Sequence, residues 1–361
     1  MDIFQTRPKV DDVEGRSQGF AQLTEQKAIN LALQGGGAHG AFSWGVLDRL
    51  LDDTRITIDG ISAASAGAIN AAVLAYGWSS GGRDGAKRAL ADFWRRLSDT
   101  ALMGPLQASW FDRAIGNYSL SWSPSFVVFD ILTRLFSPYQ LNPLNRNPLR
   151  DLLVDSIDFD VLRAASCPIK LFISATNIRT GKIKVFEREE ISAESVLASA
   201  CLPHLFQAVE IDGEHYWDGG YMGNPALFPL IYNSASPDVL VVHVNPLCRE
   251  ELPQTATDIL NRLNEISFNS SLMREMRVIN FVTRLIDEKR VHDGSLRRML
   301  MHNISADEHM TKLSAASKLN GDWQFLTHLR EIGRESAGSW ISANFDKVGR
   351  ESTADFQNQY L

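Results

Sequence analysis

The sequence predicts an α/β fold in which helices cover a mainly parallel central sheet. Two short apolar runs, at residues 29–33 and 56–61, are each followed by a turn of small residues and then by a segment with helical features. Strand–turn–helix units in succession build parallel sheets, because each helix carries the chain back across the sheet. The chain has 361 residues, of which 44% are hydrophobic, and this is enough for one large domain with a sizeable core.

The first elements follow from apolar periodicity. Residues 1–28 lack it and are expected to form a loose N-terminal arm. The run at 29–33 ends at glycines, as a buried strand would, and Phe42, Val46 and Leu50 then recur at helical spacing up to about residue 52. A second strand is predicted at 56–61, and the small helix formers of residues 66–76 predict a second helix.

Residues 100–147 interrupt this alternation with a stretch rich in aromatic residues and prolines, including Trp110, Tyr118, Trp122 and Tyr139. We interpret the segment as a packed helical insertion. The alternative is a lid, or a flap that contacts lipid above an apolar acyl pocket, since amphipathic aromatic side chains suit a membrane interface.

The α/β pattern resumes at residue 170. Strands are predicted at 170–176 and 182–187, a helix at 195–200, and a hairpin at 209–217 that turns at Asp212-Gly213 and leads to Asp218. The buried run at 239–244 is interpreted as the last strand of the sheet. Residues 250–361 show helical spacing and are expected to form a helical appendage packed on the sheet domain, with a final pair of helices near Gly321 and with Asp322 as an N-cap.

Composition limits the classes of function. A net charge of −7 argues against a dedicated nucleic-acid-binding protein. The three cysteines are widely spaced and form neither a zinc pattern nor a disulfide framework, which indicates a reducing compartment. With no signal-peptide pattern and no apolar stretch of about 18 residues, we expect a cytoplasmic protein that can contact a membrane surface. No metal site is apparent, and the oligomeric state stays open.

The glycine motif at Gly35, Gly37 and Gly40 lies between the first strand and the first helix. Backbone N–H groups that no Cβ obstructs, combined with a helix N-terminus, favour binding of an anion. The same spacing also occurs in dinucleotide-binding folds, where an acidic residue about 20 positions further on binds ribose. Asp59 is the nearest candidate for that role, and it is poorly placed at the end of the second strand.

A second motif, Ala63-Ala-Ser65-Ala-Gly67, joins the second strand to its helix. A nucleophile elbow needs small residues two positions before and after the serine, because the chain turns sharply there. We therefore predict Ser65 as the nucleophile, in preference to a competing frame that would use Ser62. The structural alternative is that these small residues only allow the strand and the helix to pack closely.

Together with Asp218-Gly219-Gly220, the motifs Gly35–Gly40 and Ala63–Gly67 resemble, in this order, the patatin-like phospholipase family. Further similarity lies at 199–203 and 223–225, and the resemblance covers about residues 29–232. It implies a three-layer α/β/α fold and a Ser–Asp dyad without a cofactor. Carried over, Ser65 is the nucleophile, Asp218 the base, and the N–H groups of Gly35, Gly36 and Gly37 form the oxyanion hole.

Two positions depart from the family pattern. Ala63 replaces a glycine, and His39 stands where the family commonly has arginine, which puts in doubt any role of a fixed positive charge in ordering the glycine loop. We interpret His39 as structural. A Ser–Asp–His triad would need a later histidine such as His243, His302 or His309. His204 and His215 lack metal-ligand spacing.

We predict a serine lipid acyl hydrolase, a phospholipase A that cleaves carboxylic esters of phospholipids or related lipids. The catalytic domain is expected at 29–232, with the last strand and the helical appendage at 233–361. An intracellular polyester or neutral-lipid esterase is the alternative substrate class. A nucleotide-binding module and a catalytically silent lipid-binding scaffold are alternatives of other classes, and the scaffold would bind liposomes without releasing fatty acid.

Overall fold

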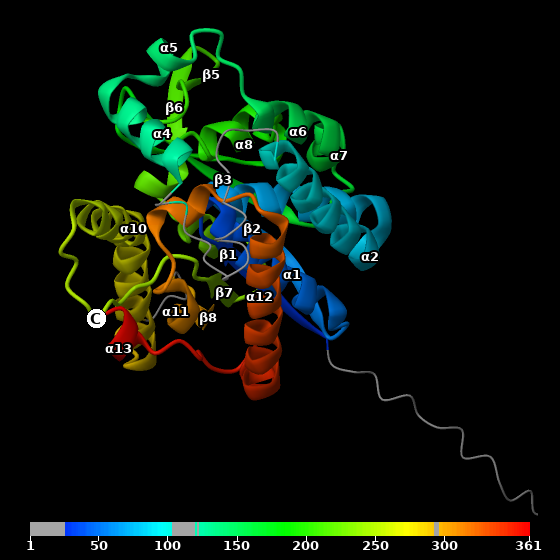
Figure 1. Cartoon of the computed structure of the whole chain (residues 1–361). Coiled ribbons are helices and arrows are strands. Elements are labelled where there is room, and N and C mark those ends of the chain that lie inside the picture. Colours follow the sequence, from blue (N-terminus) through cyan, green and yellow to red (C-terminus); the bar gives the residue numbers. More distant parts are fainter. Residues whose placement is uncertain (1–25, 103–119, 121–122, 292–295) are drawn as a thin grey trace, which may run out of the picture.

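The computed structural model describes residues 26–102, 120, 123–291 and 296–361, and an eight-stranded sheet lies at its centre (Figure 1). The strand order is β5-β6-β3-β2-β1-β7-β8, with β4 also paired to β3. The strands are β1 (Lys27–Leu33), β2 (Ile56–Ala63), β3 (Lys170–Asn177), β4 (Ile183–Phe186), β5 (Val209–Ile211), β6 (Glu214–Asp218), β7 (Asp238–Val242) and β8 (Leu300–Ile304).

The central strands are parallel, and their register fixes the site. β1 pairs in parallel with β2 and β7, so that Leu33 lies opposite Ala63 on one side and Val242 on the other. β2 and β3 are also parallel, as are β7 and β8, whereas β4 and β6 run antiparallel to β3. The predicted α/β class with a mainly parallel sheet is confirmed. The carboxyl ends of β1 and β2 lie side by side, where open α/β sheets place their ligands.

The larger hydrophobic core lies between one face of the sheet and the helices that cover it. Alternate strand residues such as Leu31, Leu33 and Val242 point into this core, which also contains Phe42 and Phe325. The elements on or beside this face are η1 (Gly37–His39), α1 (Gly40–Asp52), α2 (Ala66–Leu102), α6 (Pro148–Ser156), α7 (Phe159–Arg163), η2 (Arg188–Glu190), α8 (Ala193–Ser199), α12 (Trp323–Asn344) and η5 (Phe345–Lys347).

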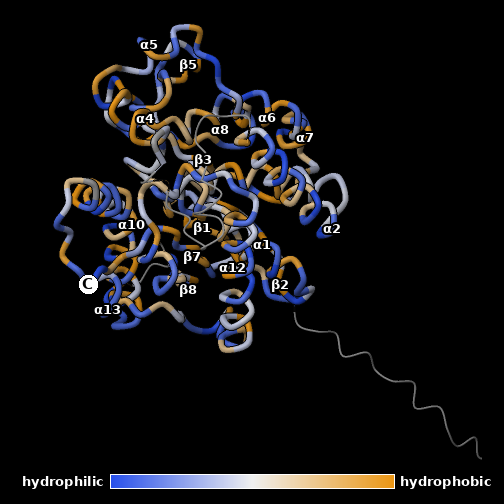
Figure 2. The backbone as a smooth tube through the Cα atoms, in the orientation of Figure 1, coloured by the Kyte–Doolittle hydropathy of each residue, from blue (hydrophilic) through white to orange (hydrophobic). Residues whose placement is uncertain are grey.

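The opposite face carries a second core, formed by the strand residues that alternate with those of the first. Ala32, Val239 and Val241 pack there against Leu230 and Leu272. Hydrophobic positions are concentrated in the central strands (Figure 2). The elements on this side and in the remaining connections are α4 (Pro124–Leu135), α5 (Pro138–Leu141), η3 (Gly219–Tyr221), α9 (Phe228–Asn233), α10 (Ala256–Asp287), α11 (Asp307–Met310), η4 (Ala315–Leu319) and α13 (Phe356–Gln359). Two cores on either side of one sheet make three layers.

Most predicted elements are present, but three predictions need correction. The second helix continues beyond residue 76 to Leu102, with a kink at Gly81 and Gly82 where the backbone leaves the helical region. β7 is not the last strand, because β8 pairs with it in parallel and forms the edge of the sheet. Consequently the C-terminal region is not purely helical. The sheet is continuous across residue 232, and the proposed domain division there stays a prediction.

The hairpin and the N-cap agree with expectation. Asp212 and Gly213 both have positive φ, 52° and 77°, at the turn between β5 and β6. Asp322 caps α12 by accepting the N–H of Gln324 at 2.9 Å. A short 3-10 turn, η4, precedes α12 in place of the first helix of the predicted pair. Of the predicted insertion, residues 103–119 and 121–122 lie outside the described residues, and the remainder contains α4 and α5.

α1 and α12 pack against each other through glycines. A Cβ atom on Gly45 would lie 1.9 Å from the carbonyl oxygen of Arg330, and one on Gly333 would lie 2.1 Å from that of Phe42. Such distances are far below van der Waals contact, so only glycine permits this approach of the two backbones. α12 is thereby fixed on α1, the helix that begins at the glycine loop.

Candidate active site

Ser65 occupies a strained turn between β2 and α2. Its φ is +53°, which is uncommon for a residue with a side chain and is typical of a nucleophile elbow. The backbone N–H of Ser65 donates to Oγ of Ser199 at 2.9 Å. Gly67 follows in the first turn of α2, where a Cβ would lie 2.4 Å from the carbonyl oxygen of Leu33. The first turn of α2 is therefore packed closely against the end of β1.

The glycine loop lies directly beside this serine. A Cβ on Gly35 would lie 2.4 Å from Cβ of Ser65, and only glycine fits. The N–H of Gly35 donates to Oδ1 of Asn224 at 2.7 Å, so it is not available to an anion, and Gly35 leaves the set of donors that we predicted. Within the described residues, the N–H groups of Gly36 and Gly37 make no hydrogen bond.

A buried network of amide side chains holds the loop. Gln34 accepts the N–H groups of Val244 and Asn245, at 3.0 and 3.1 Å. Its amide nitrogen donates to Asn269 at 2.9 Å. Asn245 completes the ring by donating to the carbonyl oxygen of Gly35 at 2.8 Å. Because these groups are buried and paired, the loop is held in one conformation before any ligand arrives.

Asp218 ends β6 and is fixed through its backbone. Its N–H donates to the carbonyl oxygen of Cys201 at 2.8 Å, and its carbonyl oxygen accepts Oγ1 of Thr176 at 2.8 Å. The next residue must be small, because a Cβ on Gly219 would lie 2.0 Å from the carbonyl oxygen of Ser174. The carboxyl oxygen Oδ1 accepts the N–H of Gly220 at 2.7 Å.

The other carboxyl oxygen of Asp218, Oδ2, is buried and completes no hydrogen bond among the described residues. Burial raises the pKa of Asp218 to about 7, against the lowering effects of Gly220, Ser65 and the positive charge of Lys318. A carboxylate with a pKa near neutrality can accept a proton from an attacking hydroxyl and return it.

An apolar pocket of about 230 Å³ opens at Ser65. Its lining comes from several elements that the sequence separates widely, and it includes Ile69, Phe93, Trp94, Leu97, Leu149, Leu205, Phe206 and Leu319. Side chains of this kind suit an alkyl chain. Ser65 is one of the residues that line this apolar pocket.

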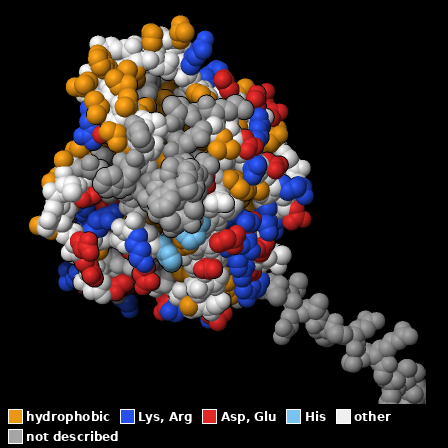
Figure 3. Space-filling view, in the orientation of Figure 1, with side chains coloured by type: hydrophobic (Ala, Val, Ile, Leu, Met, Phe, Trp, Pro, Cys, Tyr) orange, Lys and Arg blue, Asp and Glu red, His pale blue; other side chains and the backbone are white. Residues whose placement is uncertain are grey.

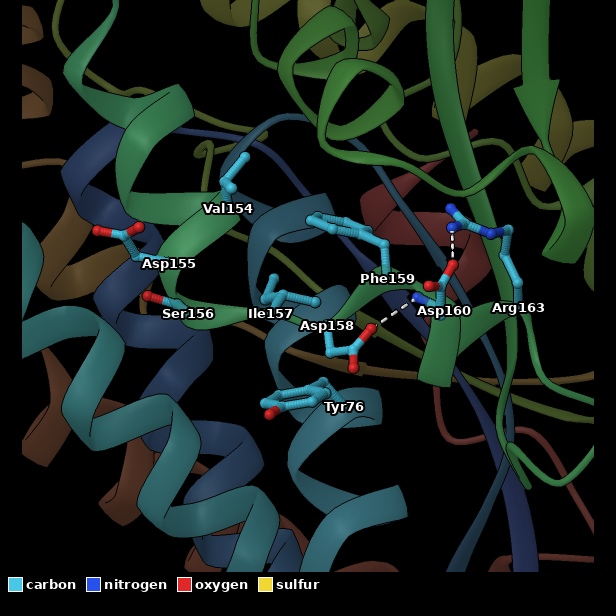
Figure 4. Close-up of a pocket in the computed structure, with 9 residues that line it drawn as sticks. All are labelled: Tyr76, Val154, Asp155, Ser156, Ile157, Asp158, Phe159, Asp160 and Arg163. Atoms are coloured by element: carbon cyan, nitrogen blue, oxygen red, sulfur yellow. Dashed lines mark hydrogen bonds and ion pairs between the residues drawn. The ribbon is translucent and has the colours of Figure 1, made fainter.

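Two larger hollows lie elsewhere on the surface. One, of about 440 Å³, is lined by Tyr76 of α2 and by residues of α6, α7 and their connection (Figure 4). Another, of about 490 Å³, follows α2. Neither contains Ser65, Asp218 or a glycine of the loop. Volume alone therefore does not locate the chemistry here.

Residues 31–231 match the family model of patatin-like phospholipase. This chain belongs to the patatin-like phospholipase family. Membership supports activity as a lipid hydrolase. Similar solved structures include VipD from Legionella pneumophila, at 15% identity over 93% of this chain and 73% of that chain, with a TM-score of 0.38. The ExoU–SpcU complex of the Pseudomonas aeruginosa type III secretion system matches at 18% identity over 90% and 53%, with a TM-score of 0.39. A comparison with curated proteins gives no match.

The two departures from the patatin-like pattern have local explanations. Ala63 is a regular residue of β2 and needs no positive φ, since the strained conformation falls on Ser65. His39 is buried, its Nε2 lies 2.8 Å from Oγ of Ser317, and burial lowers its pKa well below the usual value. The imidazole is therefore neutral near pH 7 and does not supply the charge of an arginine. This geometry supports the structural interpretation of His39.

The rival residues are engaged elsewhere. Ser62 is buried within β2, and its hydroxyl donates to the carbonyl oxygen of Ala226. His243 lies 2.7 Å from the Tyr360 hydroxyl, and burial lowers its pKa to about 4. Asp59, the ribose candidate, accepts N–H groups of the loop before β7. These engagements favour neither a triad nor a nucleotide site.

His302 and the remaining histidines do not change this conclusion. His302 lies between Asp238 and Thr353, at 2.9 Å from each. His204, His215 and His309 are exposed. No group of three or more His, Cys, Asp or Glu side chains within the described ranges could hold a metal ion.

Sequence reasoning missed several residues that hold the site. Asn224 enters the sequence argument only through the stretch 223–225, and Ser199 only through the stretch 199–203. Asn245 and Lys318 carry no local pattern at all. What brings them to the glycine loop is the pairing of β7 with β1 and the placement of η4, which are long-range features.

Proposed function

We propose that this chain is a serine lipid acyl hydrolase with a Ser65–Asp218 dyad. The observation that carries the proposal is the position of Ser65: strained, half-buried, at the mouth of an apolar pocket and beside a carboxyl group whose Oδ2 completes no hydrogen bond among the described residues. Serine esterases need a nucleophile, a base and anion-stabilising donors within reach of one carbonyl. The N–H groups of Gly36 and Gly37 are the proposed donors.

Acylation begins when Oγ of Ser65 attacks the ester carbonyl and its proton passes to Oδ2 of Asp218. The carbonyl oxygen becomes an oxyanion that the glycine N–H groups hold. The tetrahedral intermediate then collapses, the bond to the alcohol breaks, and protonated Asp218 gives its proton to the departing alkoxide. The products of this half-reaction are an alcohol and an acyl group esterified to Ser65.

Water completes the cycle. Asp218, again ionised, accepts a proton from a water molecule that attacks the acyl carbonyl, and a second oxyanion forms in the same place. When this intermediate collapses, the proton returns to Oγ of Ser65 and the fatty acid leaves. A carboxylate is a weaker base than imidazole at its ordinary pKa, so burial of Asp218, which raises its pKa to about 7, brings it into a useful range.

The substrate class is a lipid carboxylic ester, and phospholipid is the form we propose, with cleavage of phospholipase A type. The apolar lining of the pocket suits the acyl chain of such a lipid. A polyester or neutral-lipid esterase would use the same reaction steps, so the substrates have to be distinguished by their products. Mass-spectrometric identification of the products from a total lipid extract, compared between wild type and Ser65→Ala, separates these substrates.

We also propose peripheral contact with a membrane through α4. The face of α4 that includes Val127, Val128, Ile131 and Leu135 is exposed, and Leu135 is 70% exposed. Hydrophobic side chains gather over α4 and α5 in the upper left of Figure 3. Phe126 packs in one small apolar cluster with Leu319, which also lines the pocket. An apolar surface next to the pocket would bring the serine to the lipid interface. Among the described helices, none is both long and apolar enough to cross a bilayer.

The test of the dyad uses a fluorophosphonate probe and a short, soluble acyl ester. Ser65→Ala is expected to abolish both labelling and hydrolysis, while Ser80→Ala, a change at an exposed serine of α2, leaves both unchanged. Labelling of the Ser65→Ala protein at the wild-type rate would overturn the assignment. Liposome binding by wild type without any release of fatty acid would instead favour the silent scaffold.

A further inference from the structure

The family match ends at residue 231, yet a later segment lies against the glycine loop. This segment is η4, which precedes α12 and falls in the orange part of Figure 1. A Cβ on Gly37 would lie 2.4 Å from the carbonyl oxygen of Lys318, so the two backbones are in direct contact. Ser317 adds the hydrogen-bond contact to His39 at 2.8 Å. The loop that offers the proposed oxyanion donors is therefore packed on η4.

The side chain of Lys318 reaches the same loop through one intermediary. Its Nζ donates to Oδ1 of Asn245 at 2.9 Å, and Nδ2 of Asn245 donates to the carbonyl oxygen of Gly35 at 2.8 Å. The lysine thus fixes which way the Asn245 amide faces. Lys318 also lines the apolar pocket together with Ser65. Among the described residues that line this pocket, it is the one with a basic side chain.

Lys318 is the basic side chain whose charge acts on the carboxyl group of Asp218. Burial raises the pKa values of Cys201 and Tyr221 to about 12, so both are neutral near pH 7. His39 is neutral as well, because burial lowers its pKa. The positive charge of Lys318 lowers the pKa of Asp218, which means that it favours the ionised base.

Three charged side chains act on Lys318: those of Glu265, Arg249 and Asp218. Glu265 of α10 is buried and forms ion pairs with Arg249 at 2.7 Å and Arg262 at 3.2 Å. Burial lowers the pKa of Lys318, and Arg249 lowers it further, while Glu265 and Asp218 raise it. The pKa of Lys318 is lowered overall, with burial as the largest cause, while the carboxylates of Glu265 and Asp218 favour its protonated form. A positive charge in such a dry site acts strongly on any anion that forms beside it.

We propose that Lys318 is a positioning residue of the active site that supplies, from outside the family-matched region, the fixed positive charge that His39 does not. It holds the glycine loop through Asn245, and its charge favours both ionised Asp218 and the oxyanion. The inference rests on the proposed Ser65–Asp218 chemistry. It assigns to the C-terminal region a part in the site that the three sequence motifs do not contain.

The test compares Lys318→Met, which removes the charge at similar length, with Lys318→Arg, which keeps it. The substrate is a short, neutral, soluble ester, so that head-group and membrane effects play no part. We expect Lys318→Met to lower kcat by roughly 10- to 100-fold with little change in KM, as when a supporting group near the reacting atoms is lost. The acid limb of kcat/KM for Lys318→Met should move to higher pH, because the pKa of Asp218 rises when the positive charge is removed. Lys318→Arg should recover part of the lost kcat and part of the shift of the acid limb. Lys312→Met, at a nearby exposed lysine, is the matched control.

Equal kcat and an unmoved acid limb in folded Lys318→Met would overturn the proposal. So would a loss confined to anionic phospholipid with normal hydrolysis of the neutral ester, because the lysine would then bind a head group. If Lys318→Met does not fold, as thermal melting reports, Lys318→Gln replaces it and the same shift of the acid limb decides. Wild-type labelling that depends on Ser65 tests the proposed function separately, so failure of one does not imply failure of the other.

Discussion

Oγ of Ser199 lies 2.9 Å from the backbone nitrogen of Ser65 and accepts its N–H. The acceptor is buried at the end of α8, so the strained residue is held by a group from another part of the chain. A positive φ at a serine persists only where the surroundings hold it in place. This hydrogen bond is one of the contacts that do so.

Replacement of Ser199 by alanine removes that acceptor. We expect the free energy of unfolding to fall by about 1–2 kcal/mol and kcat to fall roughly tenfold, because a partly buried N–H loses its partner and Ser65 loses its orientation. Ser195→Ala, in the first turn of the same helix, is the comparison for general effects on α8. Thermal melting and ester hydrolysis measure the two effects. Unchanged kcat in Ser199→Ala would show that the elbow is held by other contacts.

Gly219→Ala tests the close approach behind Asp218. Its Cβ would collide with the carbonyl oxygen of Ser174 at 2.0 Å, so β6 or β3 has to move. We expect a loss of at least about 2 kcal/mol of unfolding free energy and a loss of activity, since overpacking of this kind strains the backbone. At Gly213 a Cβ would meet nothing within 4 Å, and Gly213→Asn, which suits its positive φ, should be nearly neutral. Chemical denaturation gives both values.

The pH dependence of hydrolysis follows from the base. Asp218 must be ionised to accept the proton of Ser65, and burial raises its pKa to about 7. We therefore expect kcat/KM to rise with pH on an acid limb centred near 7 and to be about tenfold lower for each pH unit further below it. A limb near the ordinary pKa of an aspartate, about 4, would exclude Asp218 as a base buried in this way. Steady-state rates on a soluble ester suffice.

The burial of Asp218 also predicts that folding stability falls as pH rises, whereas activity rises. Folded Asp218 holds a proton up to about pH 7, whereas the unfolded chain releases it near 3.8, so the folding stability that this group contributes falls as pH rises between these values. Asp218→Asn does not titrate. It should be inactive yet more stable than wild type at pH 8, by up to about 4 kcal/mol, and the advantage should shrink toward pH 4. Because Glu275 also has a pKa of about 7, the difference between the two proteins is the quantity to measure.

Substitutions on α4 test the membrane contact. Val128→Asp combined with Ile131→Asp places two charges on the exposed apolar face. We expect loss of binding to phospholipid vesicles and of hydrolysis within them, with normal hydrolysis of a soluble ester, because charged side chains do not enter the interface. Leu252→Asp, at an apolar residue that is 80% exposed, is the matched control. Co-sedimentation of the double variant with vesicles to the same extent as wild type would contradict the assignment of this face.

The turns around the proposed site can be predicted from the sequence because their constraints are local. Gly67 and Gly219 are needed where a Cβ would strike a neighbouring carbonyl oxygen, and such requirements leave glycine at fixed offsets from a strand. The turn at Asp212-Gly213 is similarly visible, because its two residues both have positive φ. These short-range rules place Ser65 and Asp218 at strand ends, and strand order then brings the ends together.

The remaining features depend on distant partners. β8 carries His302 and Asn303 within five residues, so its sequence does not read as a buried strand, and its position comes from pairing with β7 and from the contact between His302 and Asp238. The occupied N–H of Gly35 depends on Asn224, and the cation at the loop comes from η4. A single sequence holds no local trace of such pairings, because they arise from how the layers stack.

The glycine contact of α1 with α12 also bears on how the protein is made. Gly45 and Gly333 join the helix that follows the glycine loop to one of the last helices of the chain. During synthesis α1 has no partner for this surface until α12 has left the ribosome, so we expect the two helices to belong to one cooperative folding unit. Native-state hydrogen exchange should show their amides opening together. We expect the loop beside Ser65 to acquire its final shape only after α12 has been synthesised.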